Sequence, residues 1–546
     1  MKEVTSETVD LLVIGGGITG TAIARDAAMR GLRTVLVEQH DLAWGTSSRS
    51  SRLVHGGLRY LEQGNLRLVY EASRERRTLL ALAPHLVRPA AFVFPVYRQA
   101  RVPLWKLAAG LWLYDLLALF RNVKRHRILS KRQLLELEPR IRDKDLTGGA
   151  LYYDAQCDDA RLTVATARSA ILHGAMVGTY MRVERLELVD NRARGARIRD
   201  RLTGERGLIR ATTVVNATGP WTDSLRRLEF PHAPQLLRPT KGAHVVVERQ
   251  RVGNTHALTI TSPIDERVMF ILPWEDLTII GTTDTDSAMS PEDVRATQED
   301  VIYLLRSANS FFPSARLTES DVLGTFAGLR PLLRGESSGA ASTVSREHRI
   351  EQGPAGMWTI AGGKLTTCRS MAEELVDLVA RELHQDFGRA MAPASTTAEE
   401  PLPGGEAREL DPVRDAGRTL GLPEPTISHL LRLFGTEAAA IYNLCRDHRE
   451  LMEVLHPGHP AIAAEVVHVT RRELACTLED VLLRRLHLFY ETPDHGLAAA
   501  AATARLMQPE RGWDDRAAER AVIRYERTVR QRSMAPDPPA ARDQET

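Results

Sequence analysis

Residues 11–38 read LLVIGGGITGTAIARDAAMRGLRTVLVE, and this stretch decides the fold. Its continuous apolar runs, 11–14 and 34–37, predict two strands that are buried on both faces. The segment 18–30 between them predicts a helix with small residues on its packing side, and Gly31 is a suitable helix stop. This order of strand, glycine turn, helix and strand predicts a Rossmann-like unit built on a parallel sheet.

The glycine turn and the acidic residue after the second strand predict dinucleotide binding. Gly15 permits the tight turn, Gly17 lets a pyrophosphate approach the backbone, and Gly20 lets the helix pack closely on the strand. The helix N-terminus supplies amide donors, and Glu38 suits a ribose hydroxyl. A glycine turn alone is also typical of a flexible loop, but the agreement of all these elements favours a dinucleotide. Their position at the beginning of the chain favours FAD.

A serine-rich segment, 41–64, follows the second strand. Its hydroxyls are too many for the core of a strand or helix, so an ordinary surface loop is one interpretation. Paired glycines beside His55, Arg59 and Tyr60 suit the close approach of a flat ring. We therefore interpret this segment as a flavin-contacting loop.

Two later strand ends resemble the first glycine turn. The segment 214–217 predicts a buried strand that leads into a glycine turn at 219. The run 357–360 leads into GGKLTT at 362–367, which precedes a predicted helix. A helix N-terminus there would stabilise negative charge on a reduced flavin.

The remaining patterns predict an antiparallel sheet and several helices. Alternating β-branched runs over 236–285 predict a sheet that covers the flavin as a lid, and 180–213 predicts a smaller antiparallel sheet. Ser290–Asp293 is a suitable start for a helix to about residue 310. Further helices are predicted at 65–83 and 159–173.

Composition and charge limit the function classes. The 546 residues carry 72 Lys and Arg against 70 Asp and Glu, a net charge of +2 that argues against a dedicated nucleic-acid binder. The four cysteines are far apart, so no sequence-local metal or iron–sulfur site is predicted, and they fit a reducing compartment. The N-terminal residues show no signal-peptide pattern.

The most apolar stretch, 107–120, is shorter than the ~20 residues that a spanning helix needs. It predicts either a core helix or, with the basic residues at 121–132, a segment that lies on a membrane face.

The patterns divide the chain into four parts. They are an FAD-dependent oxidoreductase region at 1–390, a linker at 391–413, an all-α domain at 414–531 and a disordered tail at 532–546. Within the first part, we predict FAD-binding segments at about 8–90, 145–235 and 320–390, and substrate or cap segments at about 91–144 and 236–319.

Several motifs together resemble the FAD-dependent glycerol-3-phosphate dehydrogenases, of the quinone-linked, aerobic type. The resemblance runs from about residue 8 to 530. Its markers are GGGITG (15–20), TSSRSSRLVHGGLRYLE (46–62), DDARL (158–162), NATGPW (216–221), KGAH (241–244), IIGTTD (279–284), GLRPL (328–332), SREH (345–348), GGKLTT (362–367) and TLEDVLLRR (477–485). The family implies an α/β fold in which an FAD-binding Rossmann-like domain, of the glutathione-reductase and amine-oxidase type, is interleaved with an antiparallel cap, plus a C-terminal all-α domain.

The resemblance also implies an activity. Glycerol 3-phosphate would give its C2 hydride to flavin N5 and become dihydroxyacetone phosphate, and the electrons would pass to membrane quinone. It implies His244 and Arg330 as catalytic residues. Arg59, Tyr60, Arg346 and Lys364 would bind substrate, which suits a phosphate dianion.

By the same resemblance, FAD is expected to contact residues from every glycine turn and from the serine-rich loop. They are Gly15, Gly17, Ile18, Thr19, Gly20, Glu38, Thr46, Ser47, Ser48, Arg52, His55, Gly56, Gly57, Ala217, Thr218, Gly219, Trp221, Asp284, Gly363, Lys364, Leu365 and Thr366. Arg52 stands where the family pattern has lysine. No metal is expected, and the protein is expected in the cytoplasm, peripheral on the inner face of the membrane, with a homodimer left open.

Two other functions share this fold. An amine- or amino-acid-oxidising flavoenzyme would need a carboxylate or aromatic pocket, and the cationic set argues against it. A non-catalytic flavin-binding subunit would lack the histidine and arginines, which this chain retains.

Overall fold

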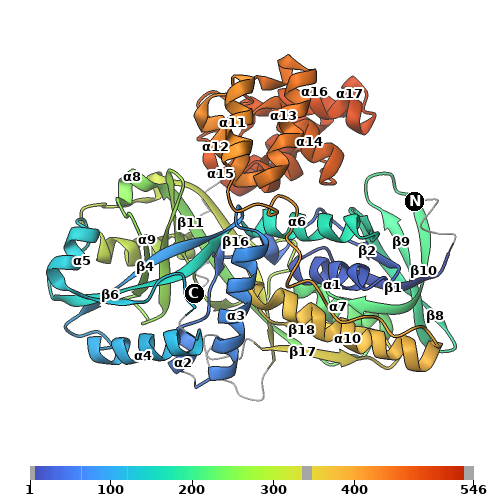
Figure 1. Cartoon of the computed structure of the whole chain (residues 1–546), viewed down its shortest axis with the longest axis horizontal. Coiled ribbons are helices and arrows are strands. Elements are labelled where there is room, and N and C mark those ends of the chain that lie inside the picture. Colours follow the sequence, from blue (N-terminus) through green and yellow to red (C-terminus); the bar gives the residue numbers. More distant parts are fainter. Residues whose placement is uncertain (1–6, 63, 120, 335–346, 534–546) are drawn as a thin grey trace, which may run out of the picture.

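The computed structural model describes residues 7–62, 64–119, 121–334 and 347–533. Two β-sheets lie beside each other, and a layer of C-terminal helices is stacked across them (Figure 1). The predicted interleaved α/β fold with a C-terminal helical domain is confirmed.

The first sheet carries the glycine turns. Its central strands run in the order β18, β10, β1, β2 and β7 and are parallel, while β17 and the pair β8–β9 are antiparallel additions. The strands are β1 (Val9–Ile14), β2 (Thr34–Val37), β7 (Met176–Gly178), β8 (Met181–Val189), β9 (Arg192–Asp200), β10 (Arg206–Asn216), β17 (His348–Gln352) and β18 (Trp358–Gly362).

Helix α1 (Ile18–Met29) follows the first glycine turn as predicted. Ala22, Ala24, Ala27 and Ala28 are all buried, because α1 packs against α6 (Asp159–Leu172) and α10 (Cys368–Phe387). These small side chains let three helices cover one face of the parallel sheet closely.

The second sheet forms the cap. Its strands are β3 (Leu53–Val54), β4 (Val87–Tyr97), β5 (Arg127–Ser130), β6 (Leu146–Cys157), β11 (Leu237–Glu248), β12 (Ala257–Thr261), β13 (Val268–Trp274), β14 (Leu277–Gly281), β15 (Thr285–Asp286) and β16 (Val322–Leu333). Strands β6 and β16 come from segments that the sequence analysis assigned to FAD binding. Instead they belong to the cap sheet, because β6 pairs with β4 and β16 pairs with β11 along their lengths.

Helices cover the outer side and the edges of the cap sheet. They are α2 (Arg59–Glu62), α3 (Leu66–Leu82), α4 (Leu104–Leu117), α5 (Lys131–Leu137), α8 (Arg249–Val252) and α9 (Gln298–Phe311), while α7 (Thr222–Glu229) lies against the first sheet.

The predicted start of α9 at Ser290–Asp293 is wrong. The helix begins at Gln298, because Thr297 and Asp300 form a reciprocal capping box there. Glu292 instead accepts hydrogen bonds from Ser290 and from the Trp221 indole.

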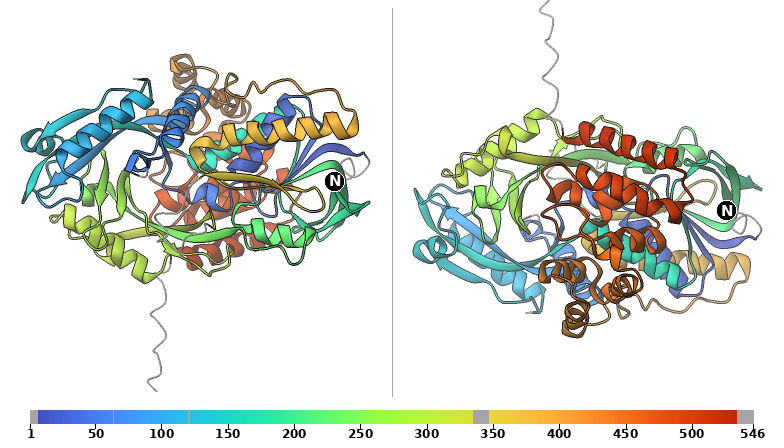
Figure 2. Two further views of the ribbon diagram at one scale, coloured as in Figure 1. Left: turned by 90° about the horizontal axis from the view of Figure 1, so that it is seen from below. Right: turned by 90° about the horizontal axis from the view of Figure 1, so that it is seen from above.

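The C-terminal region consists mainly of helices. Its elements are α11 (Asp411–Leu420), α12 (Glu424–Phe434), α13 (Ala438–Asp447), α14 (Ala463–Arg472), a π-helical turn η8 (Asp480–Arg485), α15 (Leu488–Glu491), α16 (Leu497–Arg511) and α17 (Asp515–Ser533). Viewed from above, these helices lie over the place where the two sheets meet (Figure 2). The predicted tail beyond 533 lies outside the described residues.

Candidate active site

One cavity of about 1290 Å³ runs between the two sheets. It extends from the first glycine turn past β11 to α4, so residues from both sheets line it. A cavity of this size, with apolar walls and a few charged side chains, suits a large cofactor with a small substrate beside it.

The first glycine turn has the geometry that a bound pyrophosphate needs. Gly15 has φ +115°, and a Cβ there would lie 2.6 Å from the Ala217 carbonyl oxygen. A Cβ on Gly20 would lie only 1.8 Å from the Gly15 carbonyl oxygen, so only glycine lets α1 begin this close to β1. Gly17 leaves the helix N-terminus open to the cavity wall, where the Ile18 amide donates to Ser47 Oγ at 2.9 Å.

Glu38 ends β2 at the cavity wall. Its two carboxylate oxygens accept backbone hydrogen bonds from Gly16 at 2.7 Å and from His40 at 2.8 Å. Burial raises the pKa of Glu38, and these two amides oppose that rise. Each oxygen keeps a further lone pair for a ribose hydroxyl.

The serine-rich loop joins the last glycine turn across the cavity. Thr46 Oγ1 donates to the Leu329 carbonyl at 2.6 Å. His55 donates its amide to Thr366 Oγ1 at 3.2 Å, and Thr366 lies in the short turn that precedes α10. These contacts between segments far apart in the sequence give the cavity one continuous wall.

His244 is buried on β11 and lines the cavity. Its Nε2 is 2.9 Å from Ser51 Oγ, its ring stacks on Phe326 at 4.6 Å, and its Nδ1 has no hydrogen-bond partner among the described residues. Burial, followed by the charges of Arg330 and Arg52, lowers the pKa of His244 to about 3. The imidazole is therefore neutral at pH 7 and has a lone pair to offer.

Arg330 lies on β16, the strand next to β11, where it pairs with Thr240, and its charge acts on His244. Its guanidinium donates to Asp284 at 3.1 Å, to Thr282 Oγ1 at 3.0 Å and to the Thr283 carbonyl at 3.1 Å. This holds a positive charge at a fixed place in the cavity wall.

Tyr60 and Lys364 meet at the same wall. The Lys364 ammonium lies 3.6 Å from the centre of the Tyr60 ring, and Tyr60 is buried. Arg59 is the first residue of α2, and its side chain lies outside the described part of the structure. Arg346 also lies outside the described residues.

The cavity is lined by most of the residues expected to bind FAD. They are Gly15, Gly17, Ile18, Thr19, Glu38, Thr46, Ser47, His55, Gly57, Ala217, Thr218, Gly219, Trp221, Gly363, Lys364, Leu365 and Thr366.

Five residues of the expected set are not in that lining. Gly20 lies beneath the turn, and Ser48 ends a short 3₁₀ turn. Gly56 packs on Tyr114, since a Cβ there would lie 2.3 Å from the phenol oxygen. The Arg52 guanidinium stacks on the Trp274 ring at 4.2 Å, and Asp284 accepts a hydrogen bond from Arg330.

Sequence reasoning missed residues that only the fold brings together. Ser51 contacts His244 across 193 residues of sequence, a pairing that no local spacing could reveal. Arg101 and Lys106 add positive charge to the cavity wall near α4. The sequence analysis interpreted only the basic residues at 121–132, after the apolar run, and made no prediction for Arg101 and Lys106.

Comparison with known proteins shows the family of this chain. A model of the FAD dependent oxidoreductase family matches residues 10–378, and a model of the C-terminal domain of alpha-glycerophosphate oxidase matches residues 395–518. The glycerol-3-phosphate dehydrogenase of Synechocystis is 37% identical over 97% of this chain and 98% of its own. The aerobic glycerol-3-phosphate dehydrogenase of Staphylococcus aureus is 34% identical over 90% of this chain and 88% of its own.

Solved structures give the same result. A glycerol-3-phosphate dehydrogenase from Bacillus halodurans, complexed with FAD, has a TM-score of 0.82 at 33% identity and covers 98% of this chain and 97% of its own. A glycine oxidase from Bacillus cereus shares the fold alone, with a TM-score of 0.53 at 20% identity, over 71% of this chain and 99% of its own. The chain belongs to the FAD-dependent glycerol-3-phosphate dehydrogenase family.

Proposed function

We propose that this protein oxidises sn-glycerol 3-phosphate to dihydroxyacetone phosphate with FAD and passes the electrons to a membrane quinone. The observation that carries the proposal is a buried, neutral His244 beside the fixed charge of Arg330, in a cavity that the dinucleotide-binding turn also lines. A base and a cation suit the oxidation of an alcohol, because the hydroxyl must lose its proton and its oxygen then carries negative charge.

The residues present fit FAD. The Gly15–Gly17 turn with Ile18 and Ser47 would hold the pyrophosphate, and Glu38 would hold the ribose. When bound, the flavin supplies the hydride acceptor.

His244 is proposed to take the proton of the C2 hydroxyl. Of its two ring nitrogens, Nε2 lies 2.9 Å from Ser51 Oγ, and Ser51 also lines the cavity. Because burial keeps the ring neutral, the base is ready at physiological pH without first losing a proton.

Arg330 is proposed to stabilise the negative charge that develops on the C2 oxygen as its proton leaves. The three hydrogen bonds to 282–284 orient the guanidinium before substrate arrives. Lys364, with Arg59 and Arg346 as the family resemblance implies, would pair with the phosphate.

Helix α4 is proposed to dock the protein on the membrane surface, where a quinone would be reached. One face of α4 is buried, while Trp105, Trp112 and Leu116 on the other are 74%, 56% and 54% exposed. Exposed basic residues follow at 121–132, and no described helix is long and apolar enough to span a bilayer. An apolar helix face bordered by positive charge suits an anionic lipid surface.

Steady-state turnover tests the proposed reaction. The holoprotein is given a water-soluble quinone and either glycerol 3-phosphate or glycine, and dihydroxyacetone phosphate and reduced quinone are measured. We expect both products in equal amounts from glycerol 3-phosphate and none from glycine. Turnover of glycine alone would replace this proposal with an amino-acid oxidation.

Vesicle sedimentation tests the membrane surface. The wild type should bind anionic vesicles more strongly than neutral ones, and a W105S/W112S variant should lose binding while it keeps turnover with the soluble quinone. Equal sedimentation of the variant and the wild type would reject α4 as the docking face.

A further inference from the structure

The loop 39–51 forms much of the cofactor side of the cavity. Eight of its residues line the cavity, and they are Gln39, Trp44, Gly45, Thr46, Ser47, Arg49, Ser50 and Ser51. Apart from the short turn Thr46–Ser48, this loop has no helix or strand of its own. Its position must therefore be fixed by other parts of the chain.

Asp41 anchors the first half of the loop. The side chain is fully buried and accepts from Arg484 Nε at 2.6 Å and from both terminal nitrogens of Arg485 at 2.8 Å. Burial alone would raise the pKa of Asp41, but the two arginines outweigh it and hold that pKa below its usual range. A bidentate pair of this kind fixes direction as well as distance.

Ser50 anchors the second half. Its amide and hydroxyl both donate to Asp159 Oδ2, at 3.1 and 2.6 Å. The neighbouring Asp158 caps α6 and contacts His487 Nε2 at 2.5 Å. The first anchor is thus a direct contact with Arg484 and Arg485, and the second is connected to His487 through Asp158, the sequence neighbour of Asp159.

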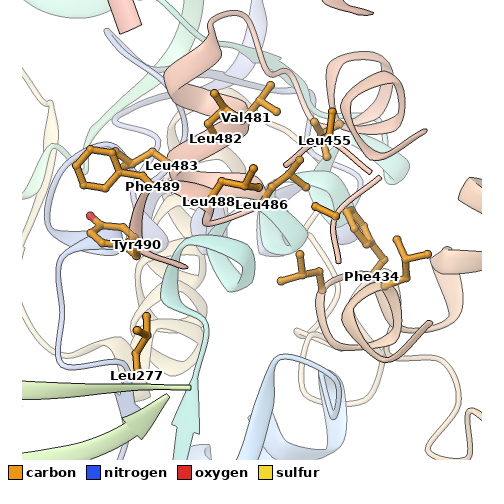
Figure 3. Close-up of a cluster of buried hydrophobic side chains, with 14 of the residues drawn as sticks. Leu277, Phe434, Leu455, Val481, Leu482, Leu483, Leu486, Leu488, Phe489 and Tyr490 are labelled. Carbon is orange, nitrogen blue, oxygen red and sulfur yellow. The ribbon is translucent and has the colours of Figure 1, made fainter. Parts of the chain in front are cut away.

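Those residues are themselves locked in place. Arg485 donates to the Glu473 carbonyl at 2.8 Å, and the Glu473 carboxylate pairs with Arg161 of α6. Apolar neighbours from Val481 to Tyr490 pack with Phe434 and Leu455 in the core of the helical region (Figure 3). This close packing of residues 481–490 holds the charged side chains of Arg484 and Arg485 in fixed positions.

We propose that the C-terminal helical region retains FAD by holding the loop 39–51 through the contacts of Arg484 and Arg485 with Asp41. These residues are positioning residues, because none of the three lines the cavity.

The rate of FAD release from full-length holoprotein tests this proposal without any substrate. D41A and R485A remove the anchor, and R485K keeps the charge but loses the bidentate geometry. E465A is the matched control, because Glu465 is an equally buried carboxylate of the helical region whose partners are His429 and the Ile462 amide.

We expect D41A and R485A to release FAD about tenfold faster or more, R485K to fall between them and the wild type, and E465A to release it at the wild-type rate. Release is measured at a temperature that lies the same number of degrees below each variant's unfolding midpoint, so that differences in stability do not affect the comparison. If D41A does not fold, R485K alone decides. Wild-type release by R485K and D41A, or equally fast release by E465A, would overturn the proposal.

Discussion

His244 and Arg330 occupy space that two glycines leave open. A Cβ on Gly281 would lie 2.1 Å from the His244 ring, and a Cβ on Gly242 would lie 2.4 Å from the Arg330 guanidinium. Gly281 is the direct cross-strand partner of His244. At the scale of single residues, the sheet therefore has room for both side chains only because their neighbours have no side chains.

Replacing the histidine tests its role as the base. H244N keeps a polar side chain but removes the basic nitrogen, so we expect kcat to fall by about 10²- to 10⁴-fold while FAD stays bound. Turnover and the flavin absorbance of the same preparation are measured together. The exposed His232 provides the control, and H232N should behave as the wild type. Near-normal kcat in H244N would remove the base assignment.

The buried His468 gives a prediction on stability and pH. Burial lowers its pKa to about 4 in the folded protein, whereas an unfolded chain titrates near ~6.5. As pH falls below ~6.5, the unfolded state takes up a proton that the folded state refuses, so this histidine destabilises the fold increasingly.

H468Q should remove that dependence. The gap in thermal midpoint between wild type and H468Q should shrink as pH falls from about 7.5 to about 5.5, because only the wild type loses stability through this group. Midpoints are measured at several pH values in one buffer series. A constant gap would show that His468 keeps its ordinary pKa.

At the scale of elements, the start of α1 is the place where a substitution is least tolerated, because α1 begins there in close contact with β1. G20A should prevent α1 from beginning against β1 and abolish FAD binding, since its Cβ would meet the Gly15 carbonyl oxygen at 1.8 Å. Gly110 lies within α4 with no atom within 4 Å of an added Cβ, so G110A should stabilise the fold by up to ~1 kcal/mol. Flavin content and unfolding midpoints of the two variants give the comparison, and normal FAD content in G20A would contradict it.

A second contact links α15 to His244, the proposed base. The rings of Tyr490 and Phe326 lie edge to face with their centres 5.8 Å apart, and Phe326 stacks on His244. Y490L should lower kcat several-fold with a smaller change in KM, while Y490F keeps the ring and should retain wild-type turnover. Equal losses in Y490L and Y490F would mean that the hydroxyl, not the ring stack, matters.

The same elements show what could be predicted from the sequence. The glycine turn, its flanking strands and α1 were predictable, because local periodicity and the small residues of α1 specify them. The start of α9 was not, since Pro291 imitates a helix start and the Thr297–Asp300 capping box is the stronger signal. Ser51 pairs with His244 across 193 residues, and Asp41 pairs with Arg485 across 444 residues. Such pairings depend on the tertiary fold, so no pattern within one segment predicts them.

At the scale of the whole molecule, three layers meet at one cavity. The parallel sheet supplies the glycine turn, the cap sheet supplies His244 and Arg330, and the helical layer supports the loop between them. Each layer contributes a different requirement of the proposed reaction: a cofactor site, a base with a cation, and a fixed cofactor loop.

Anaerobic reduction of the bound flavin tests the central claim most directly. The holoprotein is mixed without oxygen with glycerol 3-phosphate or, separately, with glycerol, and absorbance near ~450 nm is followed. We predict rapid bleaching by glycerol 3-phosphate and none by glycerol at the same concentration, because the cationic wall recognises the phosphate. Flavin that stays oxidised with glycerol 3-phosphate, in protein that retains its FAD, would contradict the account.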